Sequence, residues 1–250
     1  MISKNTIKVI KSLAHKKFRL QKKLFLVEGD KNVTEVLKSK FQIEQLYATN
    51  EFLDLNRSDL AKVKSVLEVS KEEIDRVSLL KNPQKSLALC RLPENLPLPK
   101  SILNLSIFLD GIQDPGNLGT IVRVCDWFGI DYLFCSPDTV DMFNPKVIQA
   151  TMGSFCKVQT QKVSVDEMIQ LAKKSRVSIF GAYTEGNNIY REELPVKALL
   201  VMGNEGNGIR PDLEQFIENK ISIPKFTSDA ESLNVAIATA IICSEFRRSW

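Results

Sequence analysis

The stretch ISIPKFTSDAESLNVAIATAIICSEFRR, residues Ile221 to Arg248, runs from a short β-rich segment closed by Pro224, through a polar loop, into a helix. The middle of that helix, Val235 to Cys243, is apolar or small on every side except Thr239. A helix that is apolar all round must be buried on more than one face. We therefore expect the chain to be organised around this segment.

Polar residues gather at the start of the same helix. Ser232 and Asn234 occupy the expected first turn, where a helix has free N–H groups. Ser228 with Glu231 fits the S-x-x-E capping box, and Ser232 could cap the helix alone. Capping explains one of these residues and leaves the others unexplained, so the cluster is a candidate site.

Two further stretches also pair a buried run with a small polar turn. They are LDGIQDPGNLGTIVRVCDWFGI, Leu109 to Ile130, and LLVMGNEGNGI, Leu199 to Ile209. The first predicts a strand, a turn at 114–116 and a helix from Leu118 that Gly129 ends. In the second, glycines after a strand could cradle a phosphate, but no Lys-Ser/Thr follows them and the carboxylate of Glu205 would repel one. A purely structural turn is the other interpretation of this loop.

The composition is that of a globular protein with a sizeable core. The chain has 250 residues, 44% hydrophobic and 26% charged, which allows one large or two modest domains. The net charge of +4 is modest, but Lys4 to Lys23 contains basic residues and no Asp or Glu. Such a block favours a polyanion partner, with a solvated lysine-rich face as the alternative. The basic residues are Lys4, Lys8, Lys11, Lys16, Lys17, Arg19, Lys22 and Lys23.

Five scattered cysteines, without a C-x-x-C pair and with a single histidine, argue against a zinc site and a disulfide framework. They indicate reduced thiols and a cytoplasmic location. The N-terminus has no apolar segment of signal-peptide length, and no run approaches the roughly 20 apolar residues of a membrane span. No metal is expected.

Strands and helices alternate along the chain, which predicts an α/β fold in two domains. The first, 1–92, is expected to be a small α/β domain, followed by a linker, 93–103, that overlaps the proline-rich stretch LPENLPLPK at 92–100. The second, 104–250, is expected to hold a parallel sheet covered on both faces. Its expected strands are Leu105–Leu109, Tyr132–Cys135, Lys157–Gln161, Val177–Ala182, Leu199–Met202 and Ile221–Ile223.

Taken together, the three motifs resemble the SpoU/TrmH family of the SPOUT class, S-adenosylmethionine-dependent RNA ribose 2'-O-methyltransferases. The segments KFRLQKKLFLVEGDK and NPQKSLALC resemble the family's N-terminal RNA-binding domain. The resemblance implies a trefoil-knotted catalytic domain and a homodimer built around it. It also implies a structured RNA substrate, ribosomal RNA more than transfer RNA.

The resemblance also implies roles for single residues. Arg123 matches the arginine that acts on the ribose 2'-hydroxyl; from spacing alone it could equally form a surface pair with Asp126. Because a guanidinium stays protonated, Arg123 is expected to hold a phosphate or stabilise the alkoxide, with base action left open. The implied catalytic set is Asn117, Arg123, Glu205, Ser232 and Asn234, and the implied cofactor-contacting set is Ala182, Met202, Gly203, Ile223 and Leu233.

Three rival classes remain. A Rossmann-type methyltransferase is disfavoured because no glycine-rich loop follows the first strand of either domain, and a nucleotide-phosphate enzyme because a P-loop lysine is missing. The third rival is a non-catalytic RNA-binding or ribosome-assembly protein that keeps the fold. All five expected catalytic residues are present, which argues against it.

Overall fold

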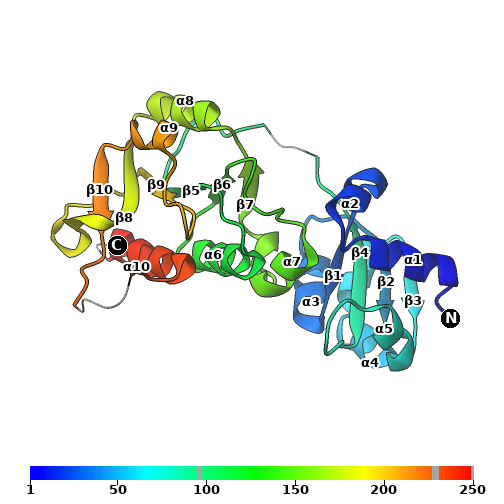
Figure 1. The fold of residues 1–250 in the computed structure, drawn as a ribbon. Coiled ribbons are helices and arrows are strands. Elements are labelled where there is room, and N and C mark those ends of the chain that lie inside the picture. The colour runs from blue at the N-terminus through cyan, green and yellow to red at the C-terminus, as the bar shows by residue number, and fades with distance from the viewer. Residues whose placement is uncertain (95–96, 227–230, 249–250) are drawn as a thin grey trace. The chain divides into compact units, whose positions relative to one another are not determined.

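The computed structural model describes residues 1–94, 97–226 and 231–248 (Figure 1). The chain forms two compact units. Unit 1 comprises Met1–Glu94 and Asp141–Lys157, and unit 2 comprises Asn95–Val140 and Val158–Trp250. Unit 1 takes residues 141–157 from the second half of the chain. A single boundary at residues 93–103, as expected from the sequence, does not describe this arrangement. That division remains a prediction about sequence domains.

Unit 1 is built on a four-stranded sheet in the order β1-β4-β2-β3. β1 and β2 each pair antiparallel with β4, while β3 pairs parallel with β2. The strands are β1 (Leu24–Glu28), β2 (Ile43–Ala48), β3 (Val66–Glu68) and β4 (Ser86–Arg91). The helices are α1 (Lys4–Ser12), α2 (Lys16–Lys22), α3 (Asp30–Lys38), α4 (Asn50–Leu55), α5 (Lys71–Val77) and α7 (Pro145–Thr151), with 3-10 turns at Arg57–Lys62 and Ser154–Cys156.

A helix cap and a cluster of aromatic rings stabilise the elements of unit 1. The start of α5 is fixed by a capping box in which Ser70 and Glu73 bond each other's backbone, as the S-x-x-E pattern predicts. The segment that carries α7 packs on the unit through aromatic rings: Phe25 of β1 lies 4.7 Å from Phe143 and 6.2 Å from Phe155 between ring centroids. Residues 141–157 are therefore part of the core of unit 1.

Unit 2 is built on a six-stranded sheet in the order β10-β8-β9-β5-β6-β7, and every neighbouring pair is parallel. This confirms the predicted parallel sheet. The strands are β5 (Ser106–Leu109), β6 (Tyr132–Cys135), β7 (Gln159–Lys162), β8 (Ser178–Asn188), β9 (Ala198–Met202) and β10 (Asn219–Ser222). The helices are α6 (Pro115–Trp127), α8 (Val165–Ser175), α9 (Pro211–Glu214) and α10 (Val235–Arg247), with a 3-10 turn at Ile189–Arg191.

Helices cover both faces of this sheet, with α8 and α9 on one side and α6 and α10 on the other (Figure 1). Alternate residues of the strands supply the two cores, because side chains in a strand point to opposite faces. Phe108 and Phe134 pack with Met168 of α8 and Leu213 of α9. On the opposite face, Phe180 contacts Phe246 of α10 edge to face, with ring centroids 5.3 Å apart.

The starts of the two motif helices differ from the expectation. α6 begins at Pro115, with Asp114 as its N-cap, so residues 114–116 are the first turn of the helix and not a separate turn before Leu118. α10 begins at Val235 with Asn234 as its cap, so Ser232 lies outside the helix. The Ser228–Glu231 capping box falls partly on residues 227–230, outside the described part of the chain.

Within one chain, α10 is buried on one side only. Thr239, Ile242 and Cys243 are buried, whereas the side chain of Ile237 is 53% exposed. The expectation of burial on more than one face is therefore not met by this chain alone. Among the described residues, every helix is too short or too polar to cross a membrane.

Candidate active site

The three motifs meet at one edge of the sheet of unit 2. β5 ends at Leu109, β9 ends at Met202 and β10 ends at Ser222, and each is followed by one of the polar motifs. Carboxyl ends of parallel strands share one edge, and open α/β sheets bind ligands in the crevice outside that edge. The sheet therefore places all three motifs where this fold binds ligands.

A chain of polar side chains joins the starts of α6 and α10 to the loop after β9. Asn234 Nδ2 donates to Asn117 Oδ1 at 2.9 Å. Asn117 Nδ2 donates in turn to Glu205 Oε1 at 2.7 Å. Three of the five residues expected to be catalytic, one from each motif, are thus in direct contact.

Helix capping leaves these side chains available. Asp114 caps α6 by accepting the backbone N–H of Asn117 at 2.8 Å, so the Asn117 side chain is not needed as a cap. Asn234 is itself a cap: its Oδ1 accepts the N–H groups of Ala236 and Ile237 at 3.0 and 3.3 Å. Its Nδ2 remains free to bridge to Asn117. One amide therefore both caps α10 and connects two motifs.

Arg123 and Ser232 stand apart from this chain of contacts. Arg123 lies on α6, is exposed, and makes no hydrogen bond or ion pair to any residue that the structure describes. Arg123 thus does not form the surface pair that its spacing to Asp126 allows. Ser232 is also exposed. The guanidinium of Arg123 is available to a ligand.

The residues expected to contact a cofactor lie around the same edge. Gly181 pairs with Val201, so Ala182 of β8 lies level with Met202 at the end of β9. Ala182 is half-buried and Met202 is buried, while Ile223 is half-buried and the Leu233 side chain is 50% exposed.

Gly203 has a structural reason to be glycine. A Cβ at this position would lie 2.4 Å from the carbonyl carbon of Gly208 and 2.6 Å from the backbone nitrogen of Ile209. The backbones of Asn204 and Gly208 exchange two hydrogen bonds of 2.9 Å, which closes the loop on itself. The structure therefore supports the interpretation of this loop as a structural turn, and contact of its backbone groups with a ligand stays a prediction.

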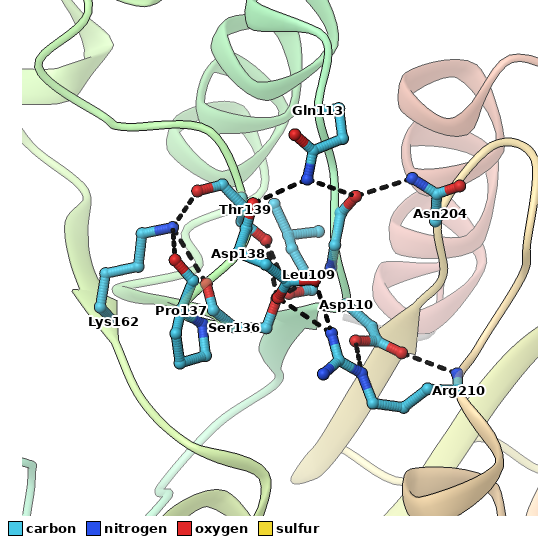
Figure 2. A network of polar contacts seen from close by, with 11 residues as sticks. Leu109, Asp110, Gln113, Ser136, Pro137, Asp138, Thr139, Lys162, Asn204 and Arg210 are labelled. Atoms are coloured by element: carbon cyan, nitrogen blue, oxygen red, sulfur yellow. Dashed lines mark hydrogen bonds and ion pairs between the residues drawn. The ribbon is translucent and has the colours of Figure 1, made fainter. Parts of the chain in front are cut away.

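Sequence reasoning missed a second polar network behind these motifs (Figure 2). Arg210 forms ion pairs with Asp110, which is 2% exposed, and with Asp138. Burial alone would raise the pKa of Asp138, but hydrogen bonds from Ser136 and Arg210 and the charge of Arg210 outweigh it and hold that pKa below its ordinary value. The signal was present in the sequence: Asp110 is a carboxylate directly after the apolar run 107–109 of a buried strand.

A hollow of about 460 Å³ in unit 2 lies at a different place. Lys173, Phe216 and Ser178 line it, and Ser178 begins β8. It therefore sits at the amino end of a strand, away from the motifs. Lys173 Nζ lies 5.3 Å from the centre of the Phe216 ring, so this ammonium group already has an aromatic partner in the same unit. Nothing links this hollow to the polar motifs.

In unit 1, the structure separates Arg19 from the basic residues predicted with it. Arg19 is 2% exposed, donates to the carbonyls of Leu13 and Ala14 at 2.8 and 3.0 Å, and pairs with Asp141. Its place in the core corrects the expectation that it contacts RNA. The seven lysines of the set are exposed and pair with no carboxylate of the described chain: Lys4, Lys8, Lys11, Lys16, Lys17, Lys22 and Lys23.

Comparison with known families matches both parts of the chain. Residues 104–244 match the SpoU rRNA Methylase family, and residues 4–88 match the MRM3-like substrate binding domain. The chain is 30% identical to the 23S rRNA (guanosine(2553)-2'-O)-methyltransferase of Bacillus subtilis, over 96% of this chain and 95% of that protein.

Solved structures give the same result for the whole chain. A TrmH-family protein from Porphyromonas gingivalis matches with a TM-score of 0.90 and 38% identity, covering 100% of both chains. An rRNA methyltransferase from Sinorhizobium meliloti with bound AdoMet matches with a TM-score of 0.88 and 28% identity, over 100% of this chain and 97% of that one. The fold class predicted from the sequence is thereby confirmed.

Proposed function

The chain belongs to the SpoU rRNA methylase family, and from that premise we propose that it transfers a methyl group from S-adenosylmethionine to a ribose 2'-hydroxyl of ribosomal RNA. The observation that carries the proposal is the hydrogen-bonded chain Asn234–Asn117–Glu205, with Arg123 unengaged on the same helix as Asn117. This arrangement offers fixed polar groups at the carboxyl edge of the sheet and, further along α6, a guanidinium that is unpaired among the described residues.

The residues at this edge fit S-adenosylmethionine. Ile223 and Leu233 offer partly exposed apolar side chains for a purine ring, and the closed loop at Gly203 brings backbone groups close to a ligand. The Glu205 carboxylate suits a site that handles a sulfonium cation. When bound, S-adenosylmethionine supplies a methyl group made electrophilic by its sulfonium, so the transfer requires no metal.

Arg123 would act on the RNA. The ribose 2'-oxygen would take up the methyl group as the carbon–sulfur bond breaks, and the hydroxyl proton would pass to water. A guanidinium in contact with water is protonated at physiological pH. We therefore assign Arg123 to holding the target phosphate or the developing alkoxide by hydrogen bonds, and not to removing the proton.

Positioning is the largest contribution that the protein makes to such a transfer. Holding an oxygen nucleophile against a carbon electrophile can lower the barrier by roughly 7 to 11 kcal/mol. The Asn234–Asn117–Glu205 chain suits that task, because it fixes the start of α6, the helix that carries Arg123, against the loop after β9 and the start of α10. Ser232, beside Asn234, is proposed to support the same site.

RNA binding is proposed for unit 1. Seven exposed lysines on and around α1 and α2 supply phosphate attraction that does not depend on base sequence. The match of residues 4–88 to a substrate-binding domain supports this role. A structured ribosomal RNA is favoured over transfer RNA, since a relative that matches 96% of this chain is a 23S rRNA methyltransferase, whereas a tRNA modifying enzyme of A. aeolicus matches 60% of it. A ribosomal RNA substrate would place the protein in the cytoplasm.

A homodimer and a trefoil knot complete the proposal. The side chains of Trp127 on α6, Ile237 on α10 and Leu233 just before α10 are 84%, 53% and 50% exposed, on two helices that pack against each other. Burying this apolar surface against a second copy would give α10 the second buried face that its composition demands. The knot is proposed from family membership and from the strand order, in which β10 returns to the sheet edge beside β8.

The proposal is tested by incubating purified protein with methyl-labelled S-adenosylmethionine and total RNA from a strain that lacks the gene. The labelled RNA is sized, and the modified nucleoside is identified. We expect label in ribosomal RNA as a 2'-O-methyl nucleoside. Label in transfer RNA would correct the substrate. No label, together with no binding of S-adenosylmethionine in calorimetry, would contradict the enzyme and favour a non-catalytic RNA-binding protein.

A further inference from the structure

We propose that Arg210 is a positioning residue for the methyl-transfer site, because it fastens together the three loops that follow β9, β5 and β6. These strands are neighbours in the sheet, so their carboxyl ends lie side by side. The inference rests on the function proposed above and adds to it a residue that is remote in sequence from the expected catalytic positions.

Arg210 makes contacts with two carboxylates through separate groups. Its Nε donates to Asp110 Oδ1 at 2.5 Å, and its backbone N–H donates to Asp110 Oδ2 at 2.8 Å. One terminal nitrogen lies 2.9 and 3.0 Å from the two oxygens of Asp138. Asp110 directly follows β5, Asp138 follows β6, and Arg210 ends the loop after β9. A single side chain thus connects all three loops (Figure 2).

The backbone at Gly111 leaves room for this arrangement. Gly111 has φ +73°, and a Cβ there would lie 3.3 Å from Asp138 Oδ2 and 3.8 Å from an Arg210 nitrogen. A larger residue would be strained and would press on the ion pair. The carbonyl of Gly111 accepts Asn204 Nδ2 at 2.7 Å, which fastens the loop after β9 to the loop after β5 a second time.

Two further side chains, from the loop after β5 and from β7, also bond to the loop after β6. Gln113 Nε2 donates to the carbonyl of Asp138 at 2.7 Å. Lys162, at the end of β7, donates to the carbonyls of Ser136, at 2.9 Å, and Thr139. The loop that carries Asp138 is therefore held from both sides, and Arg210 supplies the link toward the proposed cofactor loop.

The link matters for the site because of where each loop leads. The loop after β5 continues directly into α6, which carries Asn117 and Arg123. The loop after β9 carries Gly203 and Glu205, and Arg210 closes it. Movement of one loop against the other would separate Asn117 from Glu205, whose hydrogen bond joins the two loops. Arg210 acts through these residues and is not assigned any contact with substrate.

The geometry of the guanidinium makes arginine specific at this position. The planar guanidinium donates in several directions at fixed angles, whereas a lysine ammonium is a single point that cannot serve both carboxylates equally. Replacing Arg210 by an apolar residue would also leave Asp110 as a buried charge without its partner, which is strongly destabilising. Arg210→Lys keeps the positive charge beside Asp110 and therefore separates positioning from folding.

The test compares Arg210→Lys with the wild-type protein in thermal unfolding, in calorimetric binding of S-adenosylmethionine and in steady-state methyl transfer. We expect Tm to change little, the Kd and KM for S-adenosylmethionine to rise roughly tenfold, and the KM for RNA to stay within about twofold. Lys220→Met is the matched control, since it removes a 2.6 Å ion pair with Glu214 elsewhere in unit 2. This control should leave cofactor affinity unchanged.

A second variant covers the case in which Arg210→Lys folds poorly. The double variant Asp110→Asn with Arg210→Met removes both charges of this ion pair together and should fold while still binding S-adenosylmethionine weakly. Unchanged cofactor affinity in either folded variant overturns the positioning role. If the wild-type protein itself does not bind S-adenosylmethionine, the proposed function fails and not this inference alone.

Discussion

Basic side chains lie in opposite surroundings in the two units. On unit 1 seven lysines extend into solvent and pair with no carboxylate of the described chain. At the proposed active site of unit 2, Arg210 and Lys162 are held by carboxylates and backbone carbonyls, whereas Arg123 forms no hydrogen bond or ion pair with a described residue. Attraction of a polyanion requires mobile, hydrated charges, whereas a transfer reaction requires groups fixed before the substrate arrives.

The largest effect is expected from replacing Arg123, the arginine of the proposed site that has no hydrogen bond or ion pair with a described residue. Arg123→Ala should reduce methyl transfer at least about a hundred- to a thousandfold, because a charge-stabilising donor at the reacting oxygen is lost. Binding of S-adenosylmethionine and Tm should stay nearly unchanged, since Arg123 is exposed and forms no hydrogen bond or ion pair with a described residue. Methyl-transfer kinetics with calorimetry measures both, and full activity in this variant would refute the role.

Arg19 of unit 1 differs from the seven exposed lysines around it, because its side chain is buried in the core. Arg19→Met should lower the free energy of unfolding by about 3 to 5 kcal/mol, since it leaves Asp141 without its partner and two carbonyls without a donor. Denaturant unfolding measures this. Lys16→Met, on the same helix but exposed, is the control and should change stability little; equal stability of both variants would contradict the burial of Arg19.

Asn117→Ala tests the chain of contacts that joins the three motifs. Two hydrogen bonds are lost, and with them the attachment of α6 to Glu205 and Asn234. We expect kcat to fall roughly 10- to 100-fold, with only a small change in Tm, because each such bond contributes modestly to stability. Thr120→Ala, at an exposed position of the same helix, should keep full kcat; a matching loss there would attribute the effect to the helix and not to the contact.

The smallest effect is expected for the lysines taken together. Changing Lys4, Lys8 and Lys11 of α1 to Gln should raise the KM for RNA roughly tenfold and reduce the slope of log KM against log salt by about 2 to 3. The binding of S-adenosylmethionine should not change. The control changes Lys38, Lys40 and Lys62, exposed lysines of the same unit, to Gln. Equal loss in both triple variants would show that net charge matters and position does not.

The sequence predicted the parallel sheet of unit 2 because its strands are continuous apolar runs, and the α6 face because Leu118, Ile121 and Cys125 recur at helical spacing. It did not predict that residues 141–157 pack in unit 1. That packing depends on Phe143 and Phe155 meeting Phe25, a contact between segments more than a hundred residues apart.

Contacts between residues far apart in the sequence were also missed at the site. The resemblance of three motifs named Asn117, Glu205 and Asn234, but their mutual contacts depend on loop geometry that periodicity does not contain. Asp114 and Pro115 were readable as an N-cap followed by proline at the first helical position, and that signal would have placed the start of α6 correctly. Arg19 could not be separated from its neighbouring lysines, because burial depends on Asp141, far along the chain.

The central claim is that unit 2 methylates a ribose 2'-oxygen of ribosomal RNA with the help of Arg123. The most direct test is nucleoside analysis of ribosomal RNA from cells that lack the gene, complemented by the wild-type gene or by Arg123→Ala. We predict that one 2'-O-methyl nucleoside disappears on deletion, returns with the wild-type gene and does not return with the variant. A methylated base in its place, or full restoration by Arg123→Ala, would contradict the account.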